Sequence, residues 1–485
     1  MIGCGSMGGN MALLFAEHGI TVSLNDPSEE TMDQVLATAK KDGLQDQLQK
    51  HSSYKSLCKS LGSPKVFVFS LPHGTVGDSV VDGLHTYLSK GDIIIDASNE
   101  NWQNTQRRQG KLVPQGVYYI GMGVSGGYQA ARRGPSMCPG GEERALDIAM
   151  PLLRKVAAKD SQGNPCVAKA GTGGSGHYIK MIHNGIEHGM MSALAEAWQI
   201  MNLGLLMNYD DIAAEFDRWN GDGELRSTFL VGIGADICRQ KDDQGRHVLS
   251  IVEDKVVQDV DGTEGTGIWS QLEAVRLHVP APSLTTAHFV RLASAFRADR
   301  KRVKEAFGGQ FPVQEWGEAK GDKGLVLESL RKAVYATFLA SFVEGINIID
   351  QADQENRWNV DYSAVIQIWR NGCIIKADYI TEMLGKIFSE PHADLDLLHN
   401  KRVAQELKKT FPALQEVVLK GVEHNAIVPS LSATLEFLKY STNTILPTQF
   451  YEAQMDYFGK HMFDLKSESA GKPETGKHHF EWKLA

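Results

Sequence analysis

The sequence predicts an α/β domain with a parallel sheet in residues 1–173, followed by a large helical region. Three observations support this. A glycine-rich turn near the start leads into an apolar helical stretch and then a β-branched segment. Short apolar runs ended by loop residues recur at 65–72 and 91–97, with helical spacing between them, as buried parallel strands require. From residue 171 this pattern gives way to long helical periodicity, so we expect a domain junction there.

The composition is that of a multidomain globular protein. Its 485 residues exceed what one hydrophobic core normally supports, so we expect at least two domains. With 42% hydrophobic and 22% charged residues, we find no apolar run long enough to span a bilayer, which argues against a membrane role. The net charge of -9 comes from acids and bases mixed along the chain, without the basic stripe that attracts nucleic acid.

The cysteine pattern and the amino terminus bear on the cellular compartment. The six cysteines lie far apart, without the paired spacing of a zinc site or a disulfide framework. We therefore expect no metal and a reducing environment. The amino terminus lacks the basic start and apolar stretch of a secretory signal, so we expect a cytoplasmic protein.

The glycine-rich turn follows the pattern GxGxxG and begins a turn, helix and strand order typical of dinucleotide-binding units. Backbone N–H groups in such a turn approach a pyrophosphate at the helix start, where the helix dipole favours an anion. An isolated match is a weak signal, but the flanking helix and strand favour the functional interpretation. Because only two residues precede the turn, whereas a strand usually has about five, we expect a truncated and poorly supported central strand. The predicted cofactor contacts in the turn are Gly3, Gly5, Ser6, Met7 and Gly8.

Residues at the carboxyl ends of the predicted strands are candidates for the nicotinamide end of the site, because parallel sheets bind ligands there. Leu71 and Asn99 follow two of these strands. The motif GVSGG at 123–127 predicts a turn in which the Ser125 hydroxyl and the backbone N–H groups of Gly126 and Gly127 hold a substrate carboxylate. An ordinary turn needs no serine, so we favour a site here over a turn alone.

An acidic residue at the second strand bears on the choice of cofactor. Asp26 falls 23 residues after Gly3, where an acid bonds the ribose 2′-hydroxyl of NAD. A carboxylate would repel the 2′-phosphate of NADP, so Asp26 favours NAD. The alternative is that Asp26 simply begins an Asp-Pro-Ser turn. We assign Asn25 and Ser28 to the cofactor site with it.

The catalytic candidates share one face of a predicted helix. Lys180, His183, Asn184 and Glu187 stand at positions i, i+3, i+4 and i+7, which gathers a base, an amide and an acid. The alternative is a solvated polar face. Five glycines between 173 and 189 would weaken a purely structural helix by about 1 kcal/mol for each interior one. We explain them by close approach of backbone or ligand, and we expect all four polar residues to act in catalysis.

These motifs resemble those of the 6-phosphogluconate dehydrogenase family. The resemblance extends over nearly the whole chain and implies three parts. A Rossmann-type dinucleotide-binding domain spans 1–173, a large all-α domain spans 174–443, and a C-terminal tail at 444–485 docks on the partner subunit of a homodimer. The matching motifs stand at 123–127, 134–136, 139–141, 171–189, 216–220, 265–269, 368–375 and 456–461.

The resemblance also implies the reaction, which is oxidative decarboxylation of 6-phosphogluconate or a close aldonate to ribulose 5-phosphate and CO2, with reduction of NADP, in the pentose phosphate pathway and gluconate utilization. The residue matching Lys180 takes the proton from the 3-hydroxyl as hydride leaves carbon 3, and the residue matching Glu187 protonates carbon 1 of the enediol. Substrate-orienting positions match Asn99, Ser125, Gly126, Gly127, His183 and Asn184.

The chain departs from the family at the phosphate end of the substrate. His188 stands in place of a tyrosine, Glu264 in place of a lysine and Met455 in place of an arginine. Each hydrogen bond to a charged group contributes roughly 1.5 to 3 kcal/mol, so these changes predict weaker phosphate binding unless His188 and Arg291 compensate from nearby. Two alternatives therefore stay open, a dehydrogenase of a non-phosphorylated 3-hydroxyacid or aldonate and a non-catalytic dinucleotide-binding paralogue. The expected ligands at this end are His188, Thr266, Arg291 and His461.

Overall fold

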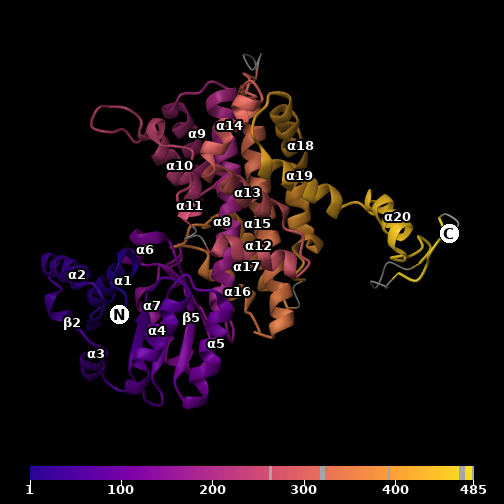
Figure 1. The fold of residues 1–485 in the computed structure, drawn as a ribbon. Coiled ribbons are helices and arrows are strands. Elements are labelled where there is room, and N and C mark those ends of the chain that lie inside the picture. Colours follow the sequence, from indigo (N-terminus) through magenta and orange to yellow (C-terminus); the bar gives the residue numbers. More distant parts are fainter. Residues whose placement is uncertain (262–264, 317–322, 392–393, 469–475, 483–485) are drawn as a thin grey trace. The chain divides into compact units, whose positions relative to one another are not determined.

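The structure is a computed structural model that describes residues 1–261, 265–316, 323–391, 394–468 and 476–482. It divides into two compact units, 1–434 and 435–485. The first unit begins with an α/β region and continues as a helical region (Figure 1). The predicted fold class is confirmed.

The α/β region contains a parallel sheet with one antiparallel edge strand. The strand β1 pairs in parallel with β2, the strands β3, β4 and β5 are parallel to one another, and β6 runs antiparallel to β5. Their bounds are β1 (Val22–Leu24), β2 (Leu48–Lys50), β3 (Val66–Phe69), β4 (Ile93–Asp96), β5 (Tyr118–Ser125) and β6 (Ser136–Gly140).

The first residues join the two groups of strands. Ile2 bridges Asn25 on one side and Phe69 on the other. The N–H of Ile2 donates to the carbonyl of Val68 at 2.8 Å, and the N–H of Gly3 donates to the carbonyl of Asn25 at 3.0 Å. The expectation of a poorly supported central strand was therefore wrong, because this short segment is hydrogen-bonded on both sides.

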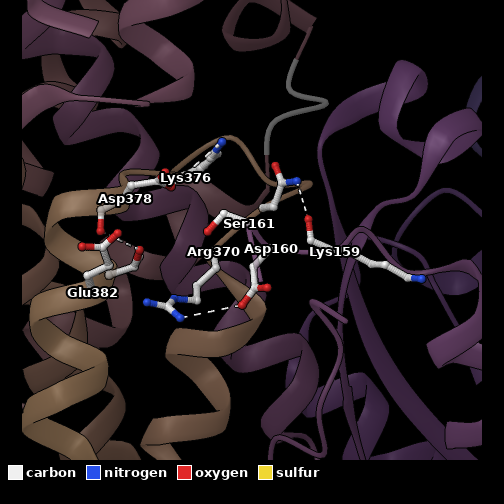
Figure 2. Close-up of a pocket in the computed structure, with 9 residues that line it drawn as sticks. Lys159, Asp160, Ser161, Arg370, Lys376, Asp378 and Glu382 are labelled. Atoms are coloured by element: carbon white, nitrogen blue, oxygen red, sulfur yellow. Dashed lines mark hydrogen bonds and ion pairs between the residues drawn. The ribbon is translucent and has the colours of Figure 1, made fainter. Parts of the chain in front are cut away.

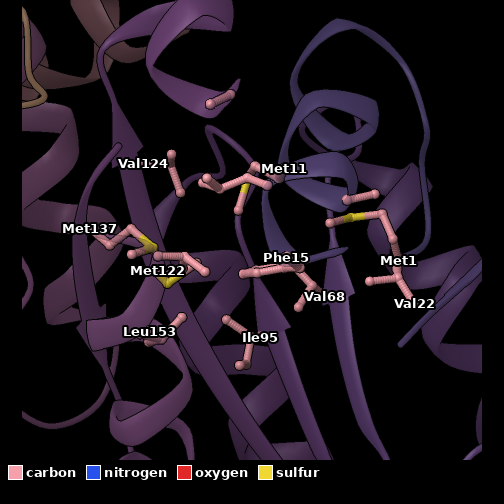
Figure 3. Close-up of a cluster of buried hydrophobic side chains, with 14 of the residues drawn as sticks. Met1, Met11, Phe15, Val22, Val68, Ile95, Met122, Val124, Met137 and Leu153 are labelled. Atoms are coloured by element: carbon pink, nitrogen blue, oxygen red, sulfur yellow. The ribbon is translucent and has the colours of Figure 1, made fainter. Parts of the chain in front are cut away.

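Helices cover both faces of the sheet and create two apolar cores. Successive strand residues alternate between them, as a period of two requires. Val68 belongs to the core that also contains Phe15 and Met122, whereas Phe67 and Phe69 belong to the other (Figure 3). The helices are α1 (Ser6–Glu17), α2 (Glu29–Lys41), α3 (Tyr54–Ser60), α4 (Thr75–Leu84), α5 (Trp102–Leu112), α6 (Gly127–Arg133) and α7 (Glu143–Val156).

In the helical region, two long helices, α8 (Ser175–Gln199) and α15 (Lys323–Asn356), pack against each other at the centre (Figure 1). By length and composition α15 is apolar enough to cross a membrane, contrary to our expectation, but 89% of that window is buried, as in the core helix of a globular protein. The remaining helices are α9 (Tyr209–Gly221), α10 (Phe229–Arg239), α11 (Gln258–Asp261), α12 (Thr266–Arg276), α13 (Pro282–Ala295), α14 (Arg297–Ala306), α16 (Tyr362–Ile368), α17 (Asp378–Phe388), α18 (Lys401–Glu423) and α19 (Pro429–Ser441).

The glycines of α8 permit close packing. A β-carbon on Gly176 would lie less than 3.0 Å from the carbonyl oxygen of Gly121, and one on Gly189 would lie less than 3.0 Å from the side chain of Ser341. The first contact brings α8 against the sheet, and the second brings it against α15. Close approach of neighbouring chain segments therefore accounts for these glycines, as predicted.

A buried acid fixes α13, which carries one of the predicted substrate ligands. Glu344 of α15 accepts hydrogen bonds from the first backbone N–H groups of α13, those of Ser283 at 3.2 Å and Leu284 at 3.1 Å. Burial raises the pKa of Glu344 to about 8 despite these bonds. The start of α13 is thus anchored to the central helix pair.

Candidate active site

The glycine turn presents an open helix start at the edge of the sheet. Gly3 has a φ of +87°, and a β-carbon there would lie less than 3.0 Å from the carbonyl oxygen of Ser70. Gly5 precedes α1, and a β-carbon on it would meet no described atom within 4 Å. Ser6 is exposed and Met7 half-buried at the first turn of α1. The open N–H groups and the helix dipole fit a pyrophosphate.

Asp26 lies beside this turn and has two internal partners. One carboxylate oxygen accepts the N–H of Cys4 at 2.7 Å, and the other accepts the N–H of Ser28 at 2.9 Å. The second bond is the Asp-Pro-Ser turn of the alternative interpretation, so Asp26 does begin a turn, but it also contacts the glycine motif. Ser28 caps α2 through the N–H of Thr31, and the Asn25 amide donates to the carbonyl of His51.

The loops after β3 and β4 are tied together. The N–H of Leu71 donates to the hydroxyl of Ser98 at 3.0 Å, and Glu100 accepts the N–H of Gly74. The guanidinium of the buried Arg108 in turn holds Glu100 at 2.9 Å. Asn99 lies between Ser98 and Glu100 and is exposed, so its side chain is available to a ligand at the carboxyl edge of the sheet.

The predicted catalytic residues come together on α8. The Lys180 amine donates to Oδ1 of Asn184 at 2.7 Å and lies 3.5 Å from Nδ1 of His183. One turn further along, a carboxylate oxygen of Glu187 lies 3.9 Å from the same Nδ1. The amide of Asn184 donates to the hydroxyl of Thr266 at 2.7 Å, which fixes the orientation of that amide. Because Lys180 and His183 are buried, this is not a solvated polar face.

His183 is held as a neutral ring. Burial, together with the nearby Lys180, lowers the pKa of His183 well below its ordinary value. Its Nδ1 lies 3.1 Å from Oδ1 of Asn184, which can only accept, so the proton is on Nδ1. Nε2 then accepts from the hydroxyl of Ser125 at 3.1 Å. The His183 ring thus connects the helix to the end of β5.

The motif at 123–127 is only partly a turn. Its first three residues continue β5 to Ser125, and the chain turns at Gly126, whose φ is +105°. The prediction of a turn from residue 123 was therefore wrong in extent. The strand needs glycine for another reason, since a β-carbon on Gly123 would lie less than 3.0 Å from the side chain of Lys180.

A segment distant in sequence completes the site. The N–H of Ile374 donates to the Ser125 hydroxyl at 3.4 Å, and the ring of Trp369 meets that of His183 edge-on at 6.2 Å. Sequence reasoning gave these residues no role, although the motif at 368–375 was a signal. The same segment also borders a cavity of about 190 Å³ lined by charges of both signs, including Asp160, Arg370 and Lys376 (Figure 2).

The predicted phosphate-end residues are partly assembled. Arg291 of α13 donates to Nε2 of His188 at 2.6 Å and forms an ion pair with Asp259 at 2.7 Å. Burial and the adjacent Arg291 lower the pKa of His188 to about 3, so its ring is neutral and brings no charge to this end. The ring of His188 stacks on that of His288. Sequence reasoning missed Asp259 and His288, which no local pattern marks.

Three other residues singled out at this end are Glu264, Met455 and His461. Glu264 lies outside the described residues, and Met455 and His461 belong to the second unit. Among the described residues, no group of three or more His, Cys, Asp or Glu side chains is arranged to hold a metal ion.

Comparisons with known proteins cover the whole chain. Residues 1–171 match the profile of the NAD binding domain of 6-phosphogluconate dehydrogenase, and residues 176–482 match that of the 6-phosphogluconate dehydrogenase C-terminal domain. The decarboxylating 6-phosphogluconate dehydrogenase of Emericella nidulans is 42% identical, over 99% of this chain and 100% of the relative. The Escherichia coli enzyme of the same name is 33% identical, over 99% and 98%.

A solved structure agrees. The 6-phosphogluconate dehydrogenase of Plasmodium falciparum, solved in its apo form and in complexes with NADP+ and 6-phosphogluconate, superposes with a TM-score of 0.90 at 29% identity, over 99% of both chains. These matches confirm the predicted family and reaction. The chain therefore belongs to the decarboxylating 6-phosphogluconate dehydrogenase family, and it is an NAD(P)-dependent oxidoreductase.

Proposed function

We propose that the α8 cluster is the catalytic centre for the oxidative decarboxylation of 6-phosphogluconate to ribulose 5-phosphate and CO2. The observation that carries this proposal is the buried Lys180 amine, bonded to Asn184 at 2.7 Å, on the same helix face as Glu187. Bound NAD(P)+ supplies the hydride acceptor. The open glycine turn and the exposed Asn99 at the sheet edge support its binding there.

Each residue of the cluster has a distinct role in this proposal. Lys180, as the free amine, takes the proton of the 3-hydroxyl and afterwards, as ammonium, stabilises the enolate oxygen left by loss of CO2. Asn184 and the neutral His183 orient the sugar hydroxyls, and Ser125 orients the carboxylate that leaves. Glu187, which is partly exposed at the open end of the face, delivers the proton to carbon 1 of the enediol.

The first test is stoichiometry and substrate choice. Purified protein should release one CO2 for each cofactor reduced. It should also use 6-phosphogluconate with a kcat/KM at least about 100-fold above that for gluconate, because Arg291 still offers charge-assisted hydrogen bonds. Coupled measurement of CO2 and reduced cofactor with both substrates checks this. Cofactor reduction without release of CO2 would contradict the proposed decarboxylation. Equal use of the two acids would favour the non-phosphorylated alternative, for which the Asp259 contact of Arg291 and the neutral His188 are the supporting observations.

We further propose that the chain prefers NAD over NADP. The Asp26 carboxylate beside the glycine turn supports this, because it would repel a 2′-phosphate.

The variant Asp26→Asn keeps the size of the side chain and removes its charge. We expect the ratio of kcat/KM with NADP+ to that with NAD+ to rise about tenfold or more, consistent with one repulsive contact. Asp33→Asn, at an exposed acid of α2 paired with Lys50, is the control and should leave the ratio unchanged. A ratio that is insensitive to Asp26→Asn would mean that this carboxylate does not face the ribose.

We also propose that the protein is a cytoplasmic homodimer, in which the C-terminal tail of each subunit docks on the partner subunit. Exposed apolar side chains on the helical region support a partner surface, among them Leu272 and Val275 on α12 and Leu419 and Val422 on α18. Phe450 of the tail is exposed as well. All six cysteines are unpaired and buried, which suits a reducing compartment.

A further inference from the structure

The second unit is organised around a buried carboxylate. Helix α20 (Thr448–Gly459) carries Asp456, which is only 1% exposed. Three of its hydrogen bonds come from the closing segment 476–482. His479 Nδ1 lies at 2.9 Å, the Trp482 indole N–H at 2.8 Å and the N–H of Phe480 at 3.2 Å. A carboxylate removed from water needs such donors, and here a segment more than twenty residues away provides them.

The fourth hydrogen bond to the Asp456 carboxylate comes from the loop that carries His461. The N–H of Met462 donates to Oδ1 of Asp456 at 3.1 Å, and the N–H of Lys460 donates to the backbone carbonyl of Asp456 at 3.0 Å. Lys460 and Met462 both have a positive backbone φ, +51° and +70°, which residues other than glycine rarely adopt. A conformation of this kind persists only where surrounding contacts impose it. The Asp456 hydrogen bonds supply those contacts on both sides of His461.

The direction of the His461 ring depends on the same loop. The ring lies over Gly459, where a β-carbon would come within 3.0 Å of it, and meets the Phe458 ring edge-on at 5.9 Å. The His461 imidazole is exposed and is held in one place by its backbone and by a neighbouring ring. Such a ring is suited to bind an anion that is not part of this unit.

We propose that Asp456 is a positioning residue, whose carboxylate couples the closing segment to the His461 loop and thereby sets the affinity for the substrate phosphate. The inference rests on the proposed use of 6-phosphogluconate and on the expectation from the sequence that His461 is a ligand of its phosphate. It also assigns a function to the closing segment. This segment supplies three of the four hydrogen-bond donors to Asp456 and, through Asp456, holds the loop of His461 in place.

The test is Asp456→Asn in the full-length protein. Asparagine keeps the shape but places an N–H2 group against donors, so the loop loses its fixed conformation. We expect the KM for 6-phosphogluconate to rise about tenfold, as for one weakened charge-assisted hydrogen bond, with kcat and the cofactor KM within about twofold. The kcat/KM for gluconate, which lacks the phosphate, should stay unchanged. Glu452→Gln, at an exposed acid one turn earlier on α20, is the matched control.

A double-mutant cycle with His461→Ala separates this inference from the role of His461 itself. If Asp456 acts through His461, the combined variant should be no worse than His461→Ala alone. An effect of His461→Ala without any effect of Asp456→Asn would overturn the positioning role while leaving the phosphate ligand intact. No effect of either variant would overturn both.

A purely structural role would produce different results. Loss of folding or of subunit association would lower turnover of gluconate as much as that of the phosphorylated acid. Light scattering at assay concentration detects such dissociation. Should Asp456→Asn fail to fold, Trp482→Phe removes one donor and keeps an aromatic ring, and it should raise the same KM to a smaller degree. An unchanged KM in that variant would count against the coupling.

Discussion

Lys180→Met should lower kcat by about 10³-fold or more and leave the KM for the cofactor within about twofold, because general base catalysis contributes about 10² to 10⁴ and the ammonium adds electrostatic stabilisation. Methionine has nearly the length of lysine and is apolar, so it fits a buried position. The amine lost is the one that donates to Asn184 at 2.7 Å. Steady-state kinetics with 6-phosphogluconate, together with cofactor binding measured by fluorescence, check both parts.

The control is a lysine outside the site. Lys111→Met removes an exposed amine of α5 that pairs with Asp82, and it should leave kcat within about twofold, as expected for a surface ion pair. If Lys180→Met retained wild-type turnover, the base would have to be elsewhere. If it lost cofactor binding as well as turnover, Lys180 would act mainly in assembling the site.

The catalytic face was predictable because it depends on local geometry. Residues at i, i+3, i+4 and i+7 share a helix face wherever that helix packs, so the grouping of Lys180 with Glu187 follows from spacing. The glycine turn was predictable for a similar reason, since its backbone conformation admits little else at Gly3. The same reasoning predicted too long a turn at 123–127. Gly123 does not reverse the chain; it lies in the strand and allows α8 to pack closely against it.

The contacts that sequence reasoning missed join residues far apart in the chain. Ile374 reaches Ser125 only through the packing of the helical region on the sheet, and Asp259 reaches Arg291 only through the packing of α11 on α13. No periodicity encodes such pairs. Asp26 illustrates a further limit, since one carboxylate both begins the turn and contacts the glycine motif, and the sequence presented these as alternatives.

Gly123→Ala should lower kcat/KM for 6-phosphogluconate by about 100-fold or more, although Gly123 has no chemical group to contribute. The added β-carbon would stand 2.9 Å from Cγ of Lys180, nearer still to its Cβ, and 3.0 Å from the carbonyl oxygen of Gly176. Neither neighbour is the far end of a flexible side chain, so α8 must move away from β5. A misplacement of about 1 Å can cost about 10²-fold in rate, and overpacking costs about 1 to 3 kcal/mol of stability.

The matched control is Gly110→Ala in α5, where a β-carbon would meet no described atom within 4 Å. Alanine is favoured over glycine in a helix by up to about 1 kcal/mol, so this variant should unfold at the same temperature or slightly higher and keep full activity. Thermal unfolding and kinetics of the two variants separate crowding from a general effect of the added methyl group. Wild-type kcat/KM in Gly123→Ala would show that the amine tolerates displacement. A loss confined to Gly123→Ala would mean that the contact between strand and helix determines where Lys180 meets its substrate, although residue 123 itself takes no part in the chemistry.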